Sequence, residues 1–255
     1  MTYRDIQLAA MRQSAIDCGC RAGDFELDHP VIVESVPHAK ARKYLELPFA
    51  CDLVSYGSNV VASVDGRCRE PVAEYLARYP AAYCFETPAL HVLDEGFRPY
   101  GLRVCYMAEY FLPDPAALRQ YDCPYSLRLL GPQDFAALYL PAWSNALCEK
   151  RKELDVLGVG AYDGDRLVGL AACSADCDEM WQIGVDVLPG ARRQGVAAAV
   201  TSRLTAEIFA RGKIPFYCCT WANIRSARTA IKCGFRPAWA ELTAKPAAFT
   251  EEAAR

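Results

Sequence analysis

The sequence is poor in features that mark several classes of protein. Histidine occurs three times, at His29, His38 and His91, so the second half of the chain has no imidazole for acid–base chemistry. No apolar run is long enough to cross a bilayer, and no basic segment followed by an apolar one resembles an export signal. The net charge of -3 lacks the basic excess that broad nucleic-acid binding requires. We therefore expect a cytoplasmic protein with no membrane and no nucleic acid among its partners.

Cysteine, in contrast, is abundant, with thirteen residues. An odd number without an export signal favours reduced thiols over a disulfide framework, and we expect most of them to be small core residues. The only pairs with metal-like spacing are Cys18 with Cys20 and Cys173 with Cys177. Neither pair has a neighbouring histidine or a second cysteine pair, so the sequence predicts no metal site.

The length of 255 residues and the hydrophobic fraction of 53% suit two domains. A proline-rich connection at 113–124 divides them. The predicted domains are therefore 1–123 and 124–247, followed by a tail at 248–255. In the first domain we expect helices over 6–18, 70–79 and 88–99, and strands over 59–64 and 103–112.

The second domain alternates strand and helix patterns, which predicts a mixed α/β layer fold. The order begins with a strand, two helices across 132–153 and a hairpin with its turn at 163–165. A fourth strand, a helix, a fifth strand, another helix and a last strand from Arg236 follow. The predicted strands span 125–130, 156–162, 166–174, 181–188 and 215–221.

One stretch of this domain, 185–197, combines a strand, a tight turn and the start of a helix. Pro189 and Gly190 end the strand, and Gly212 is placed to end the helix. The helix is indicated by apolar residues four apart on one stripe: Val196, Val200, Leu204 and Ile208. A helix that begins after such a turn presents unpaired N–H groups and the positive end of its dipole to an anion. Because Arg192 and Arg193 add charge there, the sequence predicts a phosphate-binding turn.

Two familiar phosphate loops do not fit. A P-loop needs Lys followed by Ser or Thr, whereas Gly195 is followed by Val196 and Ala197. The pair Gly158 and Gly160 begins like a dinucleotide fingerprint, but the third glycine is missing and the segment has a strand pattern throughout.

Arg192, Gly195 and Ala197 fit a pattern of Gln or Arg, two residues, Gly, one residue, and Gly or Ala. Upstream, 187–189 supplies Val, any residue, Pro, and downstream 223–235 starts at Asn and ends in Gly-Phe. In both motifs the chain resembles the GNAT N-acetyltransferase superfamily. The resemblance implies a GNAT-like mixed sheet flanked by helices in the C-terminal half. It also implies that the smaller α/β N-terminal domain is similar to the cap domains of some bacterial GNAT-like proteins.

The resemblance further implies acetyl-CoA as co-substrate. Its pyrophosphate would rest on the backbone N–H groups of 192–197, that is Arg192, Arg193, Gln194, Gly195, Val196 and Ala197. Its pantetheine arm would run beside Val185 and Val187, with the Val185 N–H polarising the thioester carbonyl. Asn223 and Ser226 are expected cofactor contacts, and both also suit the start of a helix.

For the amine, the resemblance indicates Glu179 or Asp178 as a base, acting directly or through water. Asp186 is a weaker candidate because it alternates with Val185 and Val187 and should face the opposite side. The family often has a tyrosine seven residues after the motif Asn to protonate the thiolate, and here this position is Ala230. Substitutes are Tyr217, Cys219 or water.

Candidate acceptor contacts are Trp143, Asn145 and Trp181, although aromatic residues are more often part of a core. The sequence does not identify the acceptor, which we expect to be a small-molecule amine. An alternative function is a non-catalytic module that binds acyl-CoA. The first domain carries no catalytic motif and is predicted to be a scaffold, a homodimer surface or a wall of the acceptor pocket.

Overall fold

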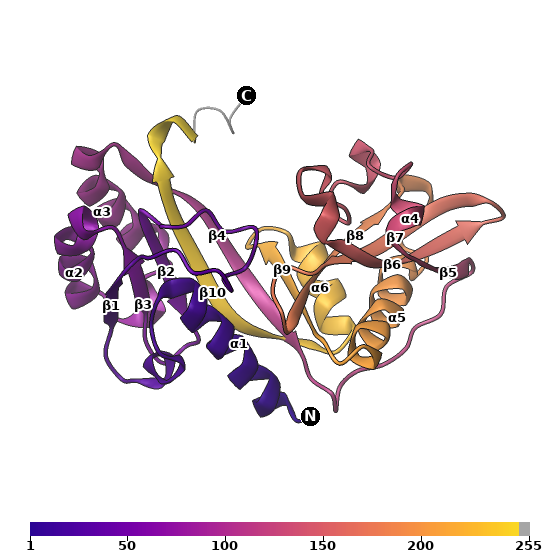
Figure 1. Cartoon of the computed structure of the whole chain (residues 1–255), viewed down its shortest axis with the longest axis horizontal. Coiled ribbons are helices and arrows are strands. Elements are labelled where there is room, and N and C mark those ends of the chain that lie inside the picture. Colours follow the sequence, from indigo (N-terminus) through magenta and orange to yellow (C-terminus); the bar gives the residue numbers. More distant parts are fainter. Residues whose placement is uncertain (250–255) are drawn as a thin grey trace. The chain divides into compact units, whose positions relative to one another are not determined.

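The computed structural model describes residues 1–249, which form two compact units (Figure 1). Unit 1 consists of 1–6 and 111–237, and the described part of unit 2 consists of 7–110 and 238–249. Two long strands, β4 (Leu102–Pro113) and β10 (Phe235–Pro246), pass from one unit into the other. The domain boundaries expected from the sequence, at 123 and 247, stay a prediction. Residues 250–255 of the predicted tail lie outside the described residues.

The sheet of unit 1 is mixed, as the alternating patterns predict. Four strands pair antiparallel in the order β8-β7-β6-β5, and β9 joins β8 in parallel. Gly164, in the predicted hairpin turn between β6 and β7, has a φ of 60° that favours glycine. The strands are β5 (Ser126–Leu130), β6 (Asp155–Asp163), β7 (Arg166–Ser174), β8 (Met180–Val187) and β9 (Ile214–Thr220).

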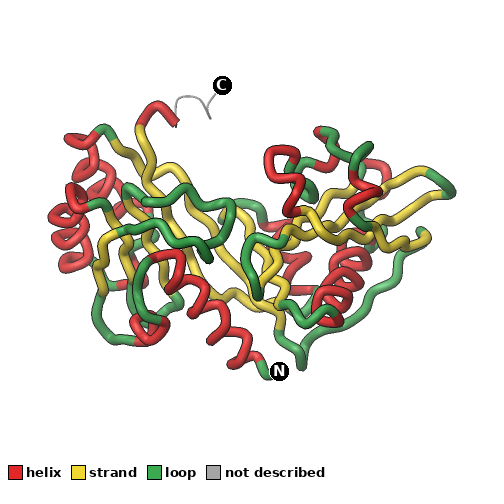
Figure 2. Tube along the Cα trace, in the orientation of Figure 1, coloured by secondary structure: helices red, strands yellow, loops and turns green. Residues whose placement is uncertain are grey.

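Helices cover both faces of this sheet, as Figure 2 shows in red against yellow. Helix α5 (Val196–Ala210) packs its predicted apolar stripe into one core, together with α6 (Ile224–Lys232). The other face is covered by α4 (Pro132–Phe135) and a 3-10 turn, Pro141–Trp143, and a second 3-10 turn, Glu149–Leu154, leads into β6. The prediction of two helices across 132–153 was wrong beyond the first turn. Pro141 has no N–H and keeps the preceding residue extended, which prevents a continuous helix.

Unit 2 contains a sheet with the order β1-β3-β2-β10-β4. One face is covered by two of the predicted helices, α2 (Arg69–Arg78) and α3 (Thr87–Phe97), over a single apolar core. Strand β3 (Val61–Val64) lies within the predicted strand, whereas β1 (Val31–Glu34) and β2 (Cys51–Ser55) were not predicted. The chain end completes this sheet, because β10 pairs antiparallel with β2.

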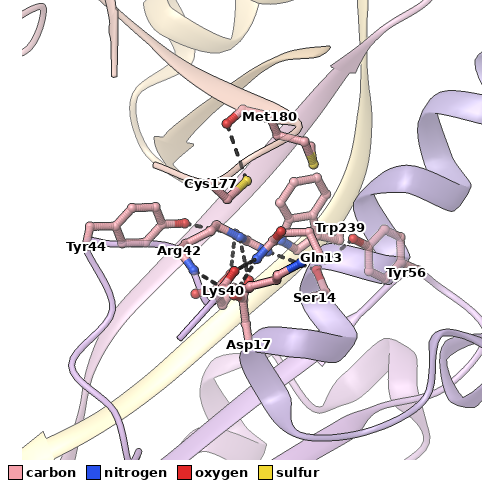
Figure 3. Close-up of polar contacts among 11 residues, drawn as sticks. Gln13, Ser14, Asp17, Lys40, Arg42, Tyr44, Tyr56, Cys177, Met180 and Trp239 are labelled. Carbon is pink, nitrogen blue, oxygen red and sulfur yellow. Dashed lines mark hydrogen bonds and ion pairs between the residues drawn. The ribbon is translucent and has the colours of Figure 1, made fainter. Parts of the chain in front are cut away.

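Helix α1 (Tyr3–Cys18) belongs mostly to unit 2 and contacts a buried polar cluster there (Figure 3). The Arg42 guanidinium is 4% exposed, and its Nε lies 2.6 Å from Asp17 Oδ2. It also donates to Ser14 Oγ at 2.9 Å, lies 3.7 Å from Glu241 and stacks 5.3 Å from the Trp239 ring. This charge cluster ties α1 to β10, which are far apart in the sequence.

Among the described residues, none of the helices combines the length and the apolar character needed to cross a membrane. The thirteen cysteines, which all lie within the described part of the chain, are free thiols.

Candidate active site

A cavity of about 650 Å³ lies at the C-terminal end of β8 in unit 1. It is bounded by β8, the turn after it, the first turn of α5, β9 and the start of α6. Its lining residues are Val185, Asp186, Val187, Pro189, Arg192, Arg193, Ala197, Tyr217, Asn223, Arg225, Ser226 and Thr229. Seven of the residues predicted from the sequence to hold a cofactor therefore line one cavity.

Strand β8 presents backbone groups to this cavity. Leu188 donates its N–H to β7 at 2.9 Å, so every second residue before it also bonds to β7. The N–H and C=O groups of Val185 and Val187 therefore point the other way, toward β9. Because the parallel pairing of β8 with β9 ends at Ile183 and Tyr217, these groups lie beyond the paired region, at an open edge. An extended ligand can take the place of a strand there.

The turn after β8 has an unusual backbone conformation. Pro189–Ala191 form a 3-10 turn, and Arg193 and Gly195 then have φ values of 63° and 82°. A residue other than glycine is strained at such angles. The Arg192 Nε donates to the Val187 carbonyl at 3.1 Å, which confirms that this carbonyl faces away from β7. The turn therefore holds Arg192 beside the open edge of β8.

Helix α5 begins at this turn with Gly195 as its N-cap residue. Ala199 donates to the Gly195 carbonyl at 3.0 Å, so the N–H groups of 196–198 precede that bond and point out of the helix end. Together with the helix dipole they form a site for an anion. Arg192, Arg193 and Arg225 add three positive charges to the lining against the single carboxylate of Asp186. The cavity therefore suits a phosphorylated ligand.

Helix α6 closes the cavity on its far side. Asn223 caps the helix by accepting the Ser226 N–H at 3.3 Å, so its capping role is present as expected. Ser226 Oγ lies 2.7 Å from the Tyr217 hydroxyl, and burial raises the pKa of that tyrosine. Asn223 and Ser226 both line the cavity, which keeps them available to a ligand.

Residues 115–239 match the family model described as GNAT acetyltransferase. The chain contains a GNAT acetyltransferase domain. No curated protein matches the chain.

The chain is similar to several solved structures, among them three acetyltransferases. A GCN5-related N-acetyltransferase from Kribbella flavida is 17% identical with a TM-score of 0.50, and the alignment covers 93% of this chain and 95% of that one. A GCN5-related N-acetyltransferase from Sphaerobacter thermophilus is 14% identical with a TM-score of 0.48, and the alignment covers 73% of this chain and 71% of that one. An acetyltransferase of the GNAT family from Colwellia psychrerythraea is 17% identical with a TM-score of 0.44, and the alignment covers 56% of this chain and 57% of that one. This chain therefore spans little more than half the length of that protein.

Within the acetyltransferase domain, three predicted cofactor residues are not part of the cavity lining. Gln194 faces the turn, where its Nε2 donates to the Gly190 carbonyl at 3.0 Å and its Oε1 accepts from Tyr125 at 3.1 Å. Gly195 shapes the backbone at the start of α5, and Val196 is 2% exposed in the core. Any contact of these three residues with a cofactor would be made by their backbone, and it stays a prediction.

The structure does not bring the candidate bases to the cavity. Asp178 and Glu179 are exposed, just before β8 begins, and their backbone carbonyls accept hydrogen bonds from Lys213 and Ile214 at 2.8 Å and 2.9 Å. The lining begins at Val185, roughly 20 Å further along an extended strand. A catalytic role of either carboxylate stays a prediction.

The candidate acceptor residues lie on different faces of the sheet. Asn145 is exposed above the face opposite α5, where its carbonyl lies so close to Gly184 that a side chain there would collide with it. Trp143 is 5% exposed in the core of that same face. Trp181 is half-buried against the α5 core. Asn145 is therefore the most exposed of the three residues.

The sequence interpretation missed two lining residues and one interaction. Arg225 and Thr229 both line the cavity, and because they are four residues apart they share one face of α6, a signal that the motif already contained. Asp186 faces away from the α5 core as predicted, and there it holds Asn145. That partner could not be identified from strand alternation alone.

Proposed function

We propose that this protein transfers an acetyl group from acetyl-CoA to the amine of a small acceptor, by direct attack in a ternary complex. The main support is one observation: a cavity that combines an open strand edge, the start of a helix and three arginines. Membership of residues 115–239 in the acetyltransferase family adds the reaction class.

In this proposal the pyrophosphate binds the N–H groups at the start of α5, and Arg192, Arg193 and Arg225 balance its charge. The pantetheine arm lies along the open edge of β8 and bonds to the backbone of Val185 and Val187. The Val185 N–H donates to the thioester oxygen, which becomes more negative as the amine attacks. Main-chain donors suit this role because they need no reorganisation.

The amine must lose a proton to become a nucleophile. We propose that it reaches the thioester from the Asn145 side of β8, and that water carries its proton away, with Glu179 or Asp178 as candidate final acceptors. The domain has no histidine, so its carboxylates and water are the available acceptors near neutral pH.

The test is release of free CoA from acetyl-CoA in the presence of a panel of small amines. At least one amine should raise the release above the rate of hydrolysis. Gly195→Glu should abolish both binding and turnover, because its carboxylate opposes the phosphates at the start of α5. The outcome that would contradict the proposal is binding of acetyl-CoA without turnover by any amine, which would indicate a non-catalytic binding module.

Two controls separate the effect of charge from that of backbone strain. Gly195→Ala has the same strain at a φ of 82° but adds no charge, so it should keep measurable binding. Gly212→Glu adds the same charge at a φ of 71°, beyond the far end of α5, and should bind like the wild type. Loss of binding in Gly212→Glu would mean that the Gly195 effect reflects folding.

A further inference from the structure

The proposed function assigns no role to Tyr217, one of the residues that line the cavity. When the carbon–sulfur bond breaks, the sulfur of CoA takes up the electron pair and needs a hydrogen-bond donor. Ala230 occupies the position where the family resemblance leads one to expect a tyrosine, and it is fully buried in the α5 core. A side-chain donor for the sulfur therefore has to come from another position.

Tyr217 lines the cavity beside the open edge of β8, along which the proposed function places the pantetheine arm. It is paired with Ile183 in the last register pair of β8 and β9, directly before the open edge that begins with Val185. Side chains of paired residues lie on the same face of a sheet, so the Tyr217 ring is on the α5 side. Its hydroxyl contacts Ser226, a second residue that lines the cavity.

The ring of Tyr217 is held in a fixed orientation. Phe111 and Phe235 pack edge-on against it, with ring centroids 6.5 Å and 6.2 Å away and interplanar angles of 82° and 60°. The residue is 2% exposed, so a change of rotamer would disturb a packed core. Its hydroxyl is therefore preorganised.

Helix α6 supplies a partner for this hydroxyl. Ser226 and Ala230 are four residues apart, on one face of the helix, and Ala230 belongs to the same core cluster as Tyr217. Both side chains are small, which is compatible with a large ring from β9. Ser226 Oγ is 2.7 Å from the Tyr217 hydroxyl and itself lines the cavity, so it connects Tyr217 to solvent.

We propose that Tyr217 is the hydrogen-bond donor and proton source for the leaving sulfur, and that Ser226 relays a proton to it. This inference rests on the proposed function. As the amine nitrogen bonds to the carbonyl carbon and the carbon–sulfur bond breaks, the Tyr217 proton moves to sulfur. The Ser226 proton moves to Tyr217 in concert, and Ser226 is reprotonated by water. The proton lost by the amine passes to solvent, which balances the exchange. Burial raises the pKa of Tyr217, so it stays protonated at any working pH.

The test compares Tyr217→Phe, Ser226→Ala and the double variant in acetyl transfer. Tyr217→Phe keeps the ring and should lower kcat by roughly 10²-fold, the usual size of an acid–base contribution, with KM for acetyl-CoA nearly unchanged. Ser226→Ala should lower kcat less, and it should add nothing in the Tyr217→Phe background because the two act as one unit. A Tyr217→Phe enzyme with the kcat of the wild type would overturn the inference.

A second readout does not depend on turnover. A hydroxyl that donates to sulfur stabilises its thiolate, so the bound CoA thiol should have a lower pKa in the wild type than in Tyr217→Phe, as measured by the ultraviolet absorbance of the thiolate. Equal thiol pKa values in both proteins would also overturn the inference.

The control is Tyr162→Phe, which removes a hydroxyl from β6 of the same unit and should leave both readouts unchanged. A wild-type protein that binds CoA but transfers no acetyl group contradicts the proposed function alone, because the thiol titration still tests Tyr217. Failure of the wild type to bind CoA at all would overturn both.

Discussion

Asp186 holds Asn145 by two hydrogen bonds that join β8 to the segment covering one face of the sheet. The Asn145 Nδ2 donates to Asp186 Oδ1 at 2.7 Å, and its backbone N–H donates to Oδ2 at 2.9 Å. The Ala146 N–H donates to the same Oδ2 at 2.9 Å. One carboxylate thus orders the turn that lies against Gly184, on the side from which we propose that the acceptor approaches.

Asp186→Ala should therefore loosen this segment. Hydrogen bonds to a charged group contribute about 1.5–3 kcal/mol, so we expect the free energy of unfolding to fall by roughly 2 kcal/mol in denaturant titrations. KM for the acceptor should rise more than KM for acetyl-CoA. Asp165→Ala removes a fully exposed carboxylate from the same unit and should change neither quantity. Equal stability of the two variants would refute the anchoring role.

Much of unit 1 could be predicted because its signals are local. Apolar residues four apart located α5, strand alternation located β8, the turn signal at 163–165 located the hairpin of β6 and β7, and the turn residues around Gly195 located the anion site. Each of these signals depends only on residues that are close together in the sequence.

The remaining features depend on contacts between distant segments. Strand β2 carries the buried Asp52, although an aspartate in a strand pattern normally indicates an exposed position. The burial of Asp52 is explained by Thr243 of β10, whose hydroxyl donates to its carboxylate at 2.7 Å. Likewise, Tyr217 and Ser226 are both visible in the sequence, but only the packing of β9 against α6 brings their hydroxyls together.

Stability should depend on pH through Asp155, a residue that the sequence did not single out. Burial raises its pKa from the ordinary 3.8 to about 6, while the Cys148 N–H and the Tyr139 hydroxyl act in the opposite direction. A carboxyl whose pKa is raised by folding stabilises the fold fully below pH 3.8, and this contribution is lost as the pH rises through 6. We expect a loss of about 3 kcal/mol over that window, at 1.36 kcal/mol per pKa unit.

Asp155→Asn should remove this loss, because an amide does not titrate. The measurement is the difference in unfolding free energy between variant and wild type at pH 4 and at pH 7. This difference, variant minus wild type, should be larger at pH 7 than at pH 4. Asp163→Asn, at an exposed position of the same strand, should show no such trend. Parallel pH profiles for Asp155→Asn and the wild type would contradict the assignment.

The buried cluster around Arg42 should be essential for unit 2. Arg42→Met leaves Asp17 and Glu241 without their cation, and breaking a buried pair in this way costs about 3–5 kcal/mol. Arg67→Met breaks the pair with Asp65, in which the arginine side chain is 71% exposed, and should cost less than about 1 kcal/mol. Chemical unfolding of both variants tests the contrast, and similar losses in the two would show that the burial of Arg42 contributes nothing.

Calorimetric titration of the purified protein with CoA and with acetyl-CoA tests the central claim most directly. We predict saturable binding of a single coenzyme per chain, which Gly195→Glu abolishes and Gly212→Glu leaves intact. Absence of binding of either coenzyme to the wild type would contradict the account.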